Sequence, residues 1–365
     1  MSSGNKPPEL KSWVESRWPG AELVSATNLD VDSGIDDTTH KGVGYGRPVR
    51  LRIRQASGEE VDLVLHTATP NAYGHDRRSD RAAEMLLAYD TFHSIPKQVV
   101  ALDVGTFRAD GTLQSLADSR EFYLVTKWAE GAVYADDLRQ MAQRQTLAAR
   151  DRERCRCLAA YLATLHQRQT SANPVAYRRS VRDLVGSGEG IFGIIDGYPE
   201  RTDGASADRL MALEARCQRW RWQLGGKSER LRQIHGDFHP FNILFDRHGQ
   251  LSLLDASRGS LGDPADDVTC LAVNYIFFAV THPGTWKSGL RALWRLFFSE
   301  YLDRTSDDAL LDHAPPYLTW RLLVLANPNW YPDITATMRD RLLQLAEQSL
   351  DRGRLDVEAA DELFA

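Results

Sequence analysis

The sequence has few cysteines and no excess of positive charge. Its four cysteines, at positions 155, 157, 217 and 270, are too few and too scattered for a disulfide framework, and none pairs with histidine at zinc-finger spacing. The 44 Lys and Arg residues against 50 Asp and Glu give a formal charge of -6, whereas nucleic-acid binding usually requires a strongly basic face. We therefore expect reduced thiols and no nucleic-acid partner.

Segments that would direct the chain to a membrane are lacking as well. The N-terminus has no apolar core of the kind found in signal peptides. The longest apolar stretch, near residues 268–280, is interrupted by Asn274 and is too short to cross a bilayer. These absences predict a cytoplasmic protein without a membrane partner, and they leave its oligomeric state open.

The length and the hydrophobic pattern predict two parts of different character. A chain of 365 residues is too long for one ordinary core, so two domains or lobes are expected. In the first part, Val49, Leu51 and Ile53 alternate with arginines, which predicts a half-buried strand with one charged face. Further along, apolar residues recur at helical spacing over residues 158–165, so the second part is expected to be mainly helical.

A polar loop between two apolar strands carries the residues of greatest chemical interest. It runs His235-Gly236-Asp237-Phe238-His239-Pro240-Phe241-Asn242, and a second short strand after it ends at Asp255. Asp237 could orient a hydroxyl and take its proton, while the Asn242 carbonyl and the Asp255 carboxylate are hard oxygen ligands that suit Mg²⁺. The alternative is a hairpin whose Asp and Asn only close turns. Six residue types at fixed offsets favour the functional interpretation.

The pattern His-Gly-Asp-x-His-Pro-x-Asn with a downstream Asp resembles the catalytic loop of the aminoglycoside phosphotransferase and choline kinase family, relatives of protein kinases. The resemblance implies an α+β, two-lobed protein-kinase-like fold. In it, residues 1–126 form a small antiparallel β-sheet lobe with one helix, 127–131 a hinge, and 132–365 a larger, mainly helical lobe. The implied reaction transfers the γ-phosphoryl group of ATP, or another nucleoside triphosphate, with Mg²⁺ to a hydroxyl of a small molecule.

The resemblance also implies a nucleotide site in the first lobe. Gly42 and Gly44 lie ahead of the strands, where the backbone could approach a phosphate, although such a run is often an ordinary turn. Glu84, on a helix expected near residues 80–92, is the candidate for the family's pairing glutamate. Strands are expected at 99–107 and 121–128, the second continuing into a hinge where Lys127, Trp128 and Ala129 would meet the adenine edge.

His66 departs from the family, whose members carry a phosphate-binding lysine at the corresponding position. A histidine supplies that positive charge only when it is protonated. Three interpretations follow: a charged His66 substitutes, Lys41 or an arginine of the second strand reaches the phosphates, or the protein is a nucleotide-binding pseudokinase.

Downstream residues are assigned supporting roles. The segment Gly262-Asp263-Pro264-Ala265-Asp266-Asp267 resembles the family's Gly-Asp-Pro-x-x-Asp, in which the last aspartate braces the catalytic loop. Asp263 is either a helix cap or an acceptor contact, and His166 is expected to be a packed structural residue.

Residues 169–228 are expected to shape the acceptor pocket. The loop 327–332 is a guess at a further part of that pocket. The acceptor is expected among amino sugars, sugars and amino alcohols, and Asp263 and Asp266 would suit a cationic one.

Overall fold

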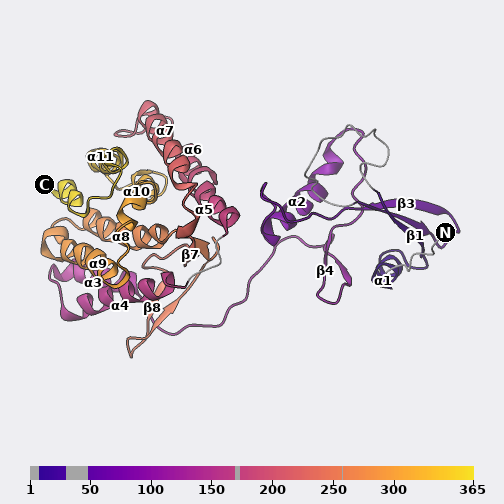
Figure 1. Cartoon of the computed structure of the whole chain (residues 1–365), viewed down its shortest axis with the longest axis horizontal. Coiled ribbons are helices and arrows are strands. Elements are labelled where there is room, and N and C mark those ends of the chain that lie inside the picture. The colour runs from indigo at the N-terminus through magenta and orange to yellow at the C-terminus, as the bar shows by residue number, and fades with distance from the viewer. Residues whose placement is uncertain (1–7, 30–47, 169–172, 257) are drawn as a thin grey trace. The chain divides into compact units, whose positions relative to one another are not determined.

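The computed structural model describes residues 8–29, 48–168, 173–256 and 258–365. The chain divides into two compact units, Met1–Thr126 and Lys127–Ala365 (Figure 1). Each unit has a hydrophobic core of its own. The units therefore combine a small sheet-bearing part and a larger helical part, as the α+β interpretation of the sequence predicts.

The first unit is built on a three-stranded antiparallel sheet. The order is β1-β2-β3, with β1 (Glu22–Asn28), β2 (Val49–Arg54) and β3 (Glu60–Leu65). Leu51 lies in the core opposite Ala26 and Leu63, because apolar residues alternate along these strands with charged ones. On the charged face, Arg52 Nε donates to Asp62 Oδ1 at 3.0 Å. Helix α1 (Pro8–Arg17) adds Leu10 and Val14 to the core.

The rest of the first unit is less regular than the sequence predicts. Helix α2 (Arg78–Thr91) confirms the helix expected near residues 80–92, and a 3-10 turn covers Phe92–Ser94. Of the strand expected at 99–107 only β4 (Gly105–Phe107) forms, paired with β5 (Leu113–Ser115). The strand expected at 121–128 is wrong, since these residues have no regular secondary structure and their side chains are exposed. A run of β-favouring residues becomes a strand only where a ladder partner is available.

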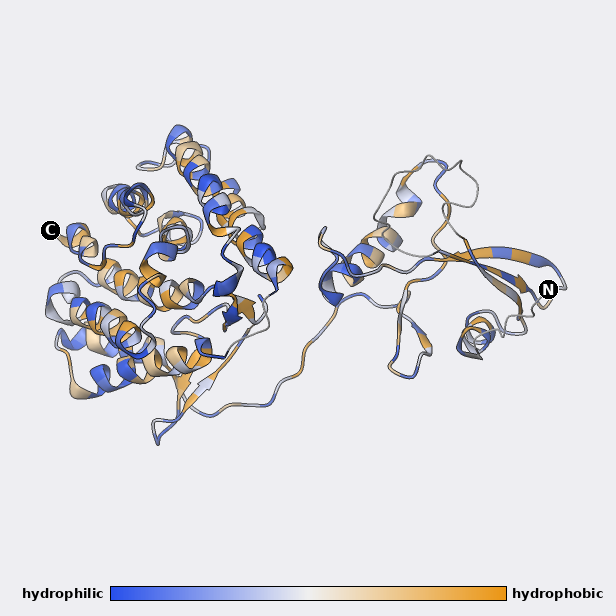
Figure 2. Ribbon diagram, in the orientation of Figure 1, coloured by the Kyte–Doolittle hydropathy of each residue, from blue (hydrophilic) through white to orange (hydrophobic). Residues whose placement is uncertain are grey.

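The second unit is mainly helical. Its helices are α3 (Tyr134–Arg144), α4 (Ala149–His166), α5 (Pro174–Gly186), α6 (Ile191–Asp196), α7 (Ala207–Leu224), α8 (Pro264–Thr281), α9 (Arg291–Thr305), α10 (Leu310–Ala326) and α11 (Ala336–Arg352). Shorter helical turns cover Ser228–Arg230, Trp286–Leu290 and Val357–Phe364. Figure 2 shows hydrophobic and hydrophilic residues side by side on the helices of this unit. Most residues of helix α8 are buried, and it contacts α3, α4, α9 and α10. It therefore forms the centre of the second core.

Short strands lie beside this helical core. β6 (Ala132–Val133), β8 (Ile243–Phe245) and β9 (Leu251–Leu253) form one antiparallel sheet, and β7 (Arg232–Gln233) pairs with β10 (Leu261–Gly262). The polar loop singled out in the sequence connects β7 to β8, and Asp255 follows β9. Both segments are thus anchored on short strands that pack against α3 and α4.

Among the described helices, none combines the length and the apolar composition that crossing a lipid bilayer requires.

The two separate cores make a prediction about local stability. Leu51 and Leu158 are both completely buried, Leu51 in the first core and Leu158 in the second. Replacing either by alanine should cost about 2–5 kcal/mol, because a cavity is left where the side chain was. Leu51→Ala should speed amide hydrogen exchange in β1–β3, and Leu158→Ala in the helices of the second unit. Equal acceleration of both units by either variant would contradict two independent cores.

Candidate active site

The loop between β7 and β8 is held in a conformation that its glycine makes possible. Gly236 has φ +84°, in the left-handed region that residues with a Cβ rarely adopt. A Cβ at this position would lie 2.8 Å from the carbonyl oxygen of Gly259, which is closer than such atoms approach. The residue before Asp237 is therefore restricted to glycine by both backbone conformation and space.

Asp267 fixes the start of this loop. Its carboxylate is completely buried and accepts the backbone N–H of His235 at 2.7 Å and that of Gly236 at 2.8 Å. His166 lies with Nε2 at 3.2 Å from the same carboxylate and with Nδ1 at 2.7 Å from the Tyr301 hydroxyl. Burial alone would raise the pKa of Asp267, but His166 and the two backbone donors lower it. The supporting role predicted for Asp267 and the structural role predicted for His166 are thus seen in the geometry.

Asp263 is a structural cap and not an acceptor contact. It is completely buried, and it accepts the backbone N–H of Ala265 at the start of α8. Arg230 donates to both of its oxygens, at 2.9 and 3.1 Å, and Tyr177 donates at 3.0 Å. His313 lies at 3.2 Å. Both carboxylate oxygens of Asp263 are thus buried and bound by protein groups. The prediction that Asp263 contacts the acceptor is therefore wrong.

Asp237 lies at the centre of a polar cluster. Its Oδ2 accepts Nδ2 of Asn242 at 3.1 Å and lies 3.4 Å from Nε2 of His239. Its Oδ1 is bound by Arg258, whose Nε also donates to the Gly236 carbonyl at 2.7 Å. The Asp237 side chain is 22% exposed to solvent, so a ligand can still reach it although several groups hold it.

The electrostatics of the cluster keep Asp237 ionised. Burial alone would raise its pKa, but the hydrogen bond from His239 and the charges of Arg258, His239 and Arg321 lower it to about 2. Cys270, 3.9 Å from Oδ1, is a neutral neighbour, because burial raises the pKa of its thiol to about 12. A carboxylate of such low pKa is a weak proton acceptor, so its chemical use would be to hold and orient a hydroxyl.

Asn242 and Asp255 lie at the same end of one hairpin. Ile243 pairs with Leu253 in the β8–β9 ladder, and the N–H of Leu254 donates to the backbone carbonyl oxygen of Asn242 at 2.9 Å. Asp255 follows directly, exposed and at φ +42°, a left-handed backbone conformation that is uncommon for a residue other than glycine. The register of the hairpin therefore places the backbones of the two predicted metal ligands on neighbouring strands at the same end.

The donor set fits a magnesium ion shared with phosphates. Nδ2 of Asn242 is occupied by Asp237, which leaves its amide oxygen as the ligand atom. In the described parts of the chain there is no group of three or more His, Cys, Asp and Glu side chains placed to hold a metal. Magnesium is commonly held by one or two protein oxygens together with phosphate oxygens and water, so two ligands suffice.

The residues predicted to hold the nucleotide are less closely organised. His66 follows β3 directly and is exposed, as is Val64 before it. Glu84, on α2, lies with Oε2 at 3.2 Å from Nε2 of His75, a contact that the sequence interpretation missed. Gly42 and Gly44 lie outside the described residues.

The expected hinge has an irregular backbone. Lys127 and Trp128 are exposed, and Ala129 is half-buried. The indole N–H of Trp128 donates to its neighbour Glu130 at 3.0 Å. The described contacts of these residues are local.

Two predicted parts of the acceptor pocket have other contacts in the structure. In the loop 327–332, Asn327 is completely buried and donates to the Ile194 carbonyl, while Asn329 donates to Gly197 at 2.7 Å. These asparagines hold α6 to the loop. Asp266 is bound by Arg321 at 2.6 Å, a pairing over 55 positions that no local pattern in the sequence indicates.

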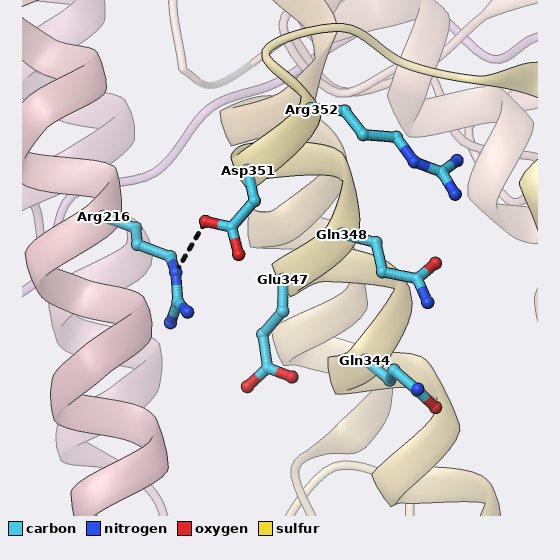
Figure 3. Close-up of a pocket in the computed structure, with 6 residues that line it drawn as sticks. All are labelled: Arg216, Gln344, Glu347, Gln348, Asp351 and Arg352. Atoms are coloured by element: carbon cyan, nitrogen blue, oxygen red, sulfur yellow. Dashed lines mark hydrogen bonds and ion pairs between the residues drawn. The ribbon is translucent and has the colours of Figure 1, made fainter.

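A cavity of about 410 Å³ lies on the surface between α7 and α11. It is lined by Arg216, Gln344, Glu347, Gln348, Asp351 and Arg352, and in Figure 3 Arg216 faces Asp351, with Nε 2.9 Å from Oδ1. None of these residues belongs to the loop that carries Asp237. The cavity is therefore separate from the candidate active site.

Residues 74–300 match the model of a phosphotransferase enzyme family. This segment includes Asp237, Asn242, Asp255 and the Asp267 brace. A search of curated proteins gives no match.

Solved structures of several kinases are distantly similar. A glucosamine kinase shares 18% identity over 60% of this chain and 59% of its own, with a TM-score of 0.41, and a second structure named glucosamine kinase is covered over 57%. An amicoumacin kinase in complex with AMP-PNP and Ca²⁺ shares 13% over 87% and 90%, with a TM-score of 0.41. An aminoglycoside phosphotransferase from Streptomyces rimosus shares 18% over 77% and 93%, with a TM-score of 0.35. The chain spans less than two thirds of the length of these two glucosamine kinase structures. The assignment of the chain to a family therefore rests on the family model and not on these distant structural similarities.

The Asp267 brace predicts a defect that is both structural and functional. In Asp267→Asn an amide N–H would face a backbone N–H of the loop, so stability should fall by about 1.5–3 kcal/mol, the usual worth of a hydrogen bond to a charged group. The loop should also lose its order, and we expect activity to fall beyond the loss explained by unfolding. Urea unfolding and turnover at a temperature where the variant is folded measure the two effects.

Asp351→Asn is the matched control for this variant, because its ion pair with Arg216 is exposed. It should change stability by at most about 1 kcal/mol. An Asp267→Asn protein that behaves like this control would show that the loop does not depend on the brace.

Proposed function

The chain belongs to the phosphotransferase enzyme family, and we propose that it transfers the γ-phosphoryl group of ATP to a hydroxyl of a small molecule. The observation that carries this proposal is the convergence of Asp237, Asn242 and Asp255 on one hairpin and its loop. Phosphoryl transfer asks little covalent chemistry of the protein and depends on positioning and charge stabilisation. A locked loop with an ionised aspartate is suited to that demand.

Asp237 has the role of orienting the acceptor. Its low pKa keeps it negative at neutral pH, so it accepts a hydrogen bond from the acceptor hydroxyl and directs that oxygen in line with the transferred group. Arg258 and Asn242 hold the two carboxylate oxygens in place. The proton of the hydroxyl passes to Asp237 late in the transfer, when the oxygen has become more acidic through its bond to phosphorus.

Asn242 and Asp255 would hold Mg²⁺ through the amide oxygen and the carboxylate. The ion would supply positive charge that offsets the charge of the nucleotide phosphates. In this proposal the first lobe, residues 1–126, grips the nucleotide through Gly42, Gly44, His66 and Glu84. The hinge, residues 127–131, meets the adenine with Lys127, Trp128 and Ala129, and residues 132–365 bind the acceptor.

A nucleotide-binding pseudokinase is the second candidate function, because His66 replaces the lysine expected in the family. The presence of Asp237, Asn242 and Asp255 together favours the enzyme, because a chain freed from catalysis need not keep both metal ligands and the base.

Removal of Asp237 tests the enzyme directly. Asp237→Ala should lower transfer by about 10²–10⁴-fold, the range expected when a positioned acid–base group is lost. ATP consumption measured against amino sugars, sugars, amino alcohols and nucleosides gives the activity, and circular dichroism checks the fold. Asp351→Ala, on the surface of α11, is the control that should keep full activity.

Two results would reject the proposal. One is normal turnover in Asp237→Ala with an acceptor that the unmodified protein uses. The other is the absence of transfer to every acceptor class together with ATP binding that is unaffected by magnesium, which would favour the pseudokinase.

The role of His66 makes a separate prediction. If His66 lies at the phosphates, His66→Lys should tighten ATP binding by about tenfold or more at pH 8. At this pH lysine is charged, whereas histidines generally are not. A unit charge about 4 Å from a phosphate is worth about 4 kcal/mol at an effective dielectric constant of about 20. Calorimetric titration with ATP measures the affinity. His93→Lys places the same charge on another exposed histidine of the first unit and should have little effect. Equal affinities of the two variants would remove His66 from the nucleotide site.

A further inference from the structure

Two guanidinium groups lie against one indole ring beside Asp237. The Cζ atom of Arg321 is 3.7 Å from the centroid of the Trp320 ring, and that of Arg258 is 4.7 Å from it. The ring is almost completely buried, and its Nε1–H donates to the carbonyl of Glu189 at 2.7 Å. The Trp320 ring is therefore already covered by two cations, which interact favourably with its π system.

The carboxylates of this cluster are already neutralised. Arg258 binds Oδ1 of Asp237, and Arg321 binds Asp266 at 2.6 Å. An ammonium group entering here would have to displace a guanidinium and would face the positive charge that remains, and like charges in contact are strongly unfavourable.

Arg321 also has a donor without an acceptor. Its side chain is 10% exposed, and its Nε–H is buried with no hydrogen-bond partner in the portion of the chain that the structure describes. Buried donors in folded proteins nearly always have an acceptor, in the protein, in ordered water or in a ligand. A hydroxyl or a carboxylate oxygen could serve as the acceptor for this N–H, whereas an ammonium group has only donors.

From these contacts we infer that Arg321 and Arg258 select the acceptor by charge, favouring a neutral polyol or a hydroxy acid over an amino sugar or amino alcohol. The inference rests on the proposed phosphotransfer and narrows its acceptor class. It also reverses the expectation, based on Asp263 and Asp266, of a cationic acceptor. Asp263 is buried against Arg230, and Asp266 is bound to Arg321.

The experiment compares acceptors that differ in one group. Glucose, glucosamine and glucuronate, and the smaller series glycerol, aminopropanediol and glycerate, are assayed for phosphorylation by the full chain with ATP and Mg²⁺. In whichever series the protein phosphorylates, we expect kcat/KM for the amine to lie about tenfold or more below that for the neutral or acidic compound. This comparison uses the unmodified protein, so it does not depend on the folding of any variant.

Variants then assign the preference to the arginine. Arg321→Gln, made together with Asp266→Asn so that no charge is left unpaired, should reduce the ratio between the acidic compound and the amine by about tenfold. Arg216→Gln made together with Asp351→Asn, at the cavity between α7 and α11, removes an ion pair elsewhere and should leave the ratio unchanged. An unchanged ratio in the double variant would overturn the role of Arg321.

Failure of the inference and failure of the proposed function give different results. A higher kcat/KM for the amines in the unmodified protein would overturn the inference and leave phosphotransfer intact. No transfer to any compound of either series or of the wider panel would contradict the proposed function, and the inference would be lost with it.

Discussion

The hydrogen bonds from the backbone of His235 and Gly236 to the buried carboxylate of Asp267 are the constraint on which the site depends. They join the loop that carries Asp237 to the first turn of α8, the central helix of the second core. His166 links the same carboxylate to α4 and, through Tyr301, to α9. A loop that would otherwise have exposed backbone groups thereby takes on the rigidity of the helical core, which is what positioning a reacting hydroxyl requires.

The second determinant is the set of positive charges around Asp237. Arg258 and His239 contact its carboxylate, and Arg321 acts from nearby on α10. They keep the aspartate ionised at the expense of its basicity, so its contribution to transfer is orientation more than proton abstraction. The same charges give the neighbourhood of the reacting oxygen a preference for acceptors without positive charge.

The sequence predicted the site where its residues are close together along the chain. Asp237, Asn242 and Asp255 lie on one loop and one hairpin, and Asp267 follows in a segment that resembles the family's, so the resemblance could be carried over position by position. Arg321 was missed because it reaches Asp266 across 55 positions, and nothing in its own helix indicates that contact. The strand expected at 121–128 failed for a related reason, since strand formation depends on a partner and not only on local propensity. The fold class followed from the resemblance that the catalytic loop carries. Hydrophobic periodicity predicted a strand-bearing first part and a mainly helical second part, which agrees with the two separate cores.

The central claim is that Asn242 and Asp255 hold the metal of a bound nucleotide on this braced loop. Calorimetric titration of the full chain with a non-hydrolysable ATP analogue, in the presence of Mg²⁺ and then of a chelator, tests it most directly. The account predicts binding that requires the metal and that Asp255→Asn weakens by about tenfold or more, as expected when a charged metal ligand is lost. Equal affinity with and without magnesium, unchanged in Asp255→Asn, would contradict it.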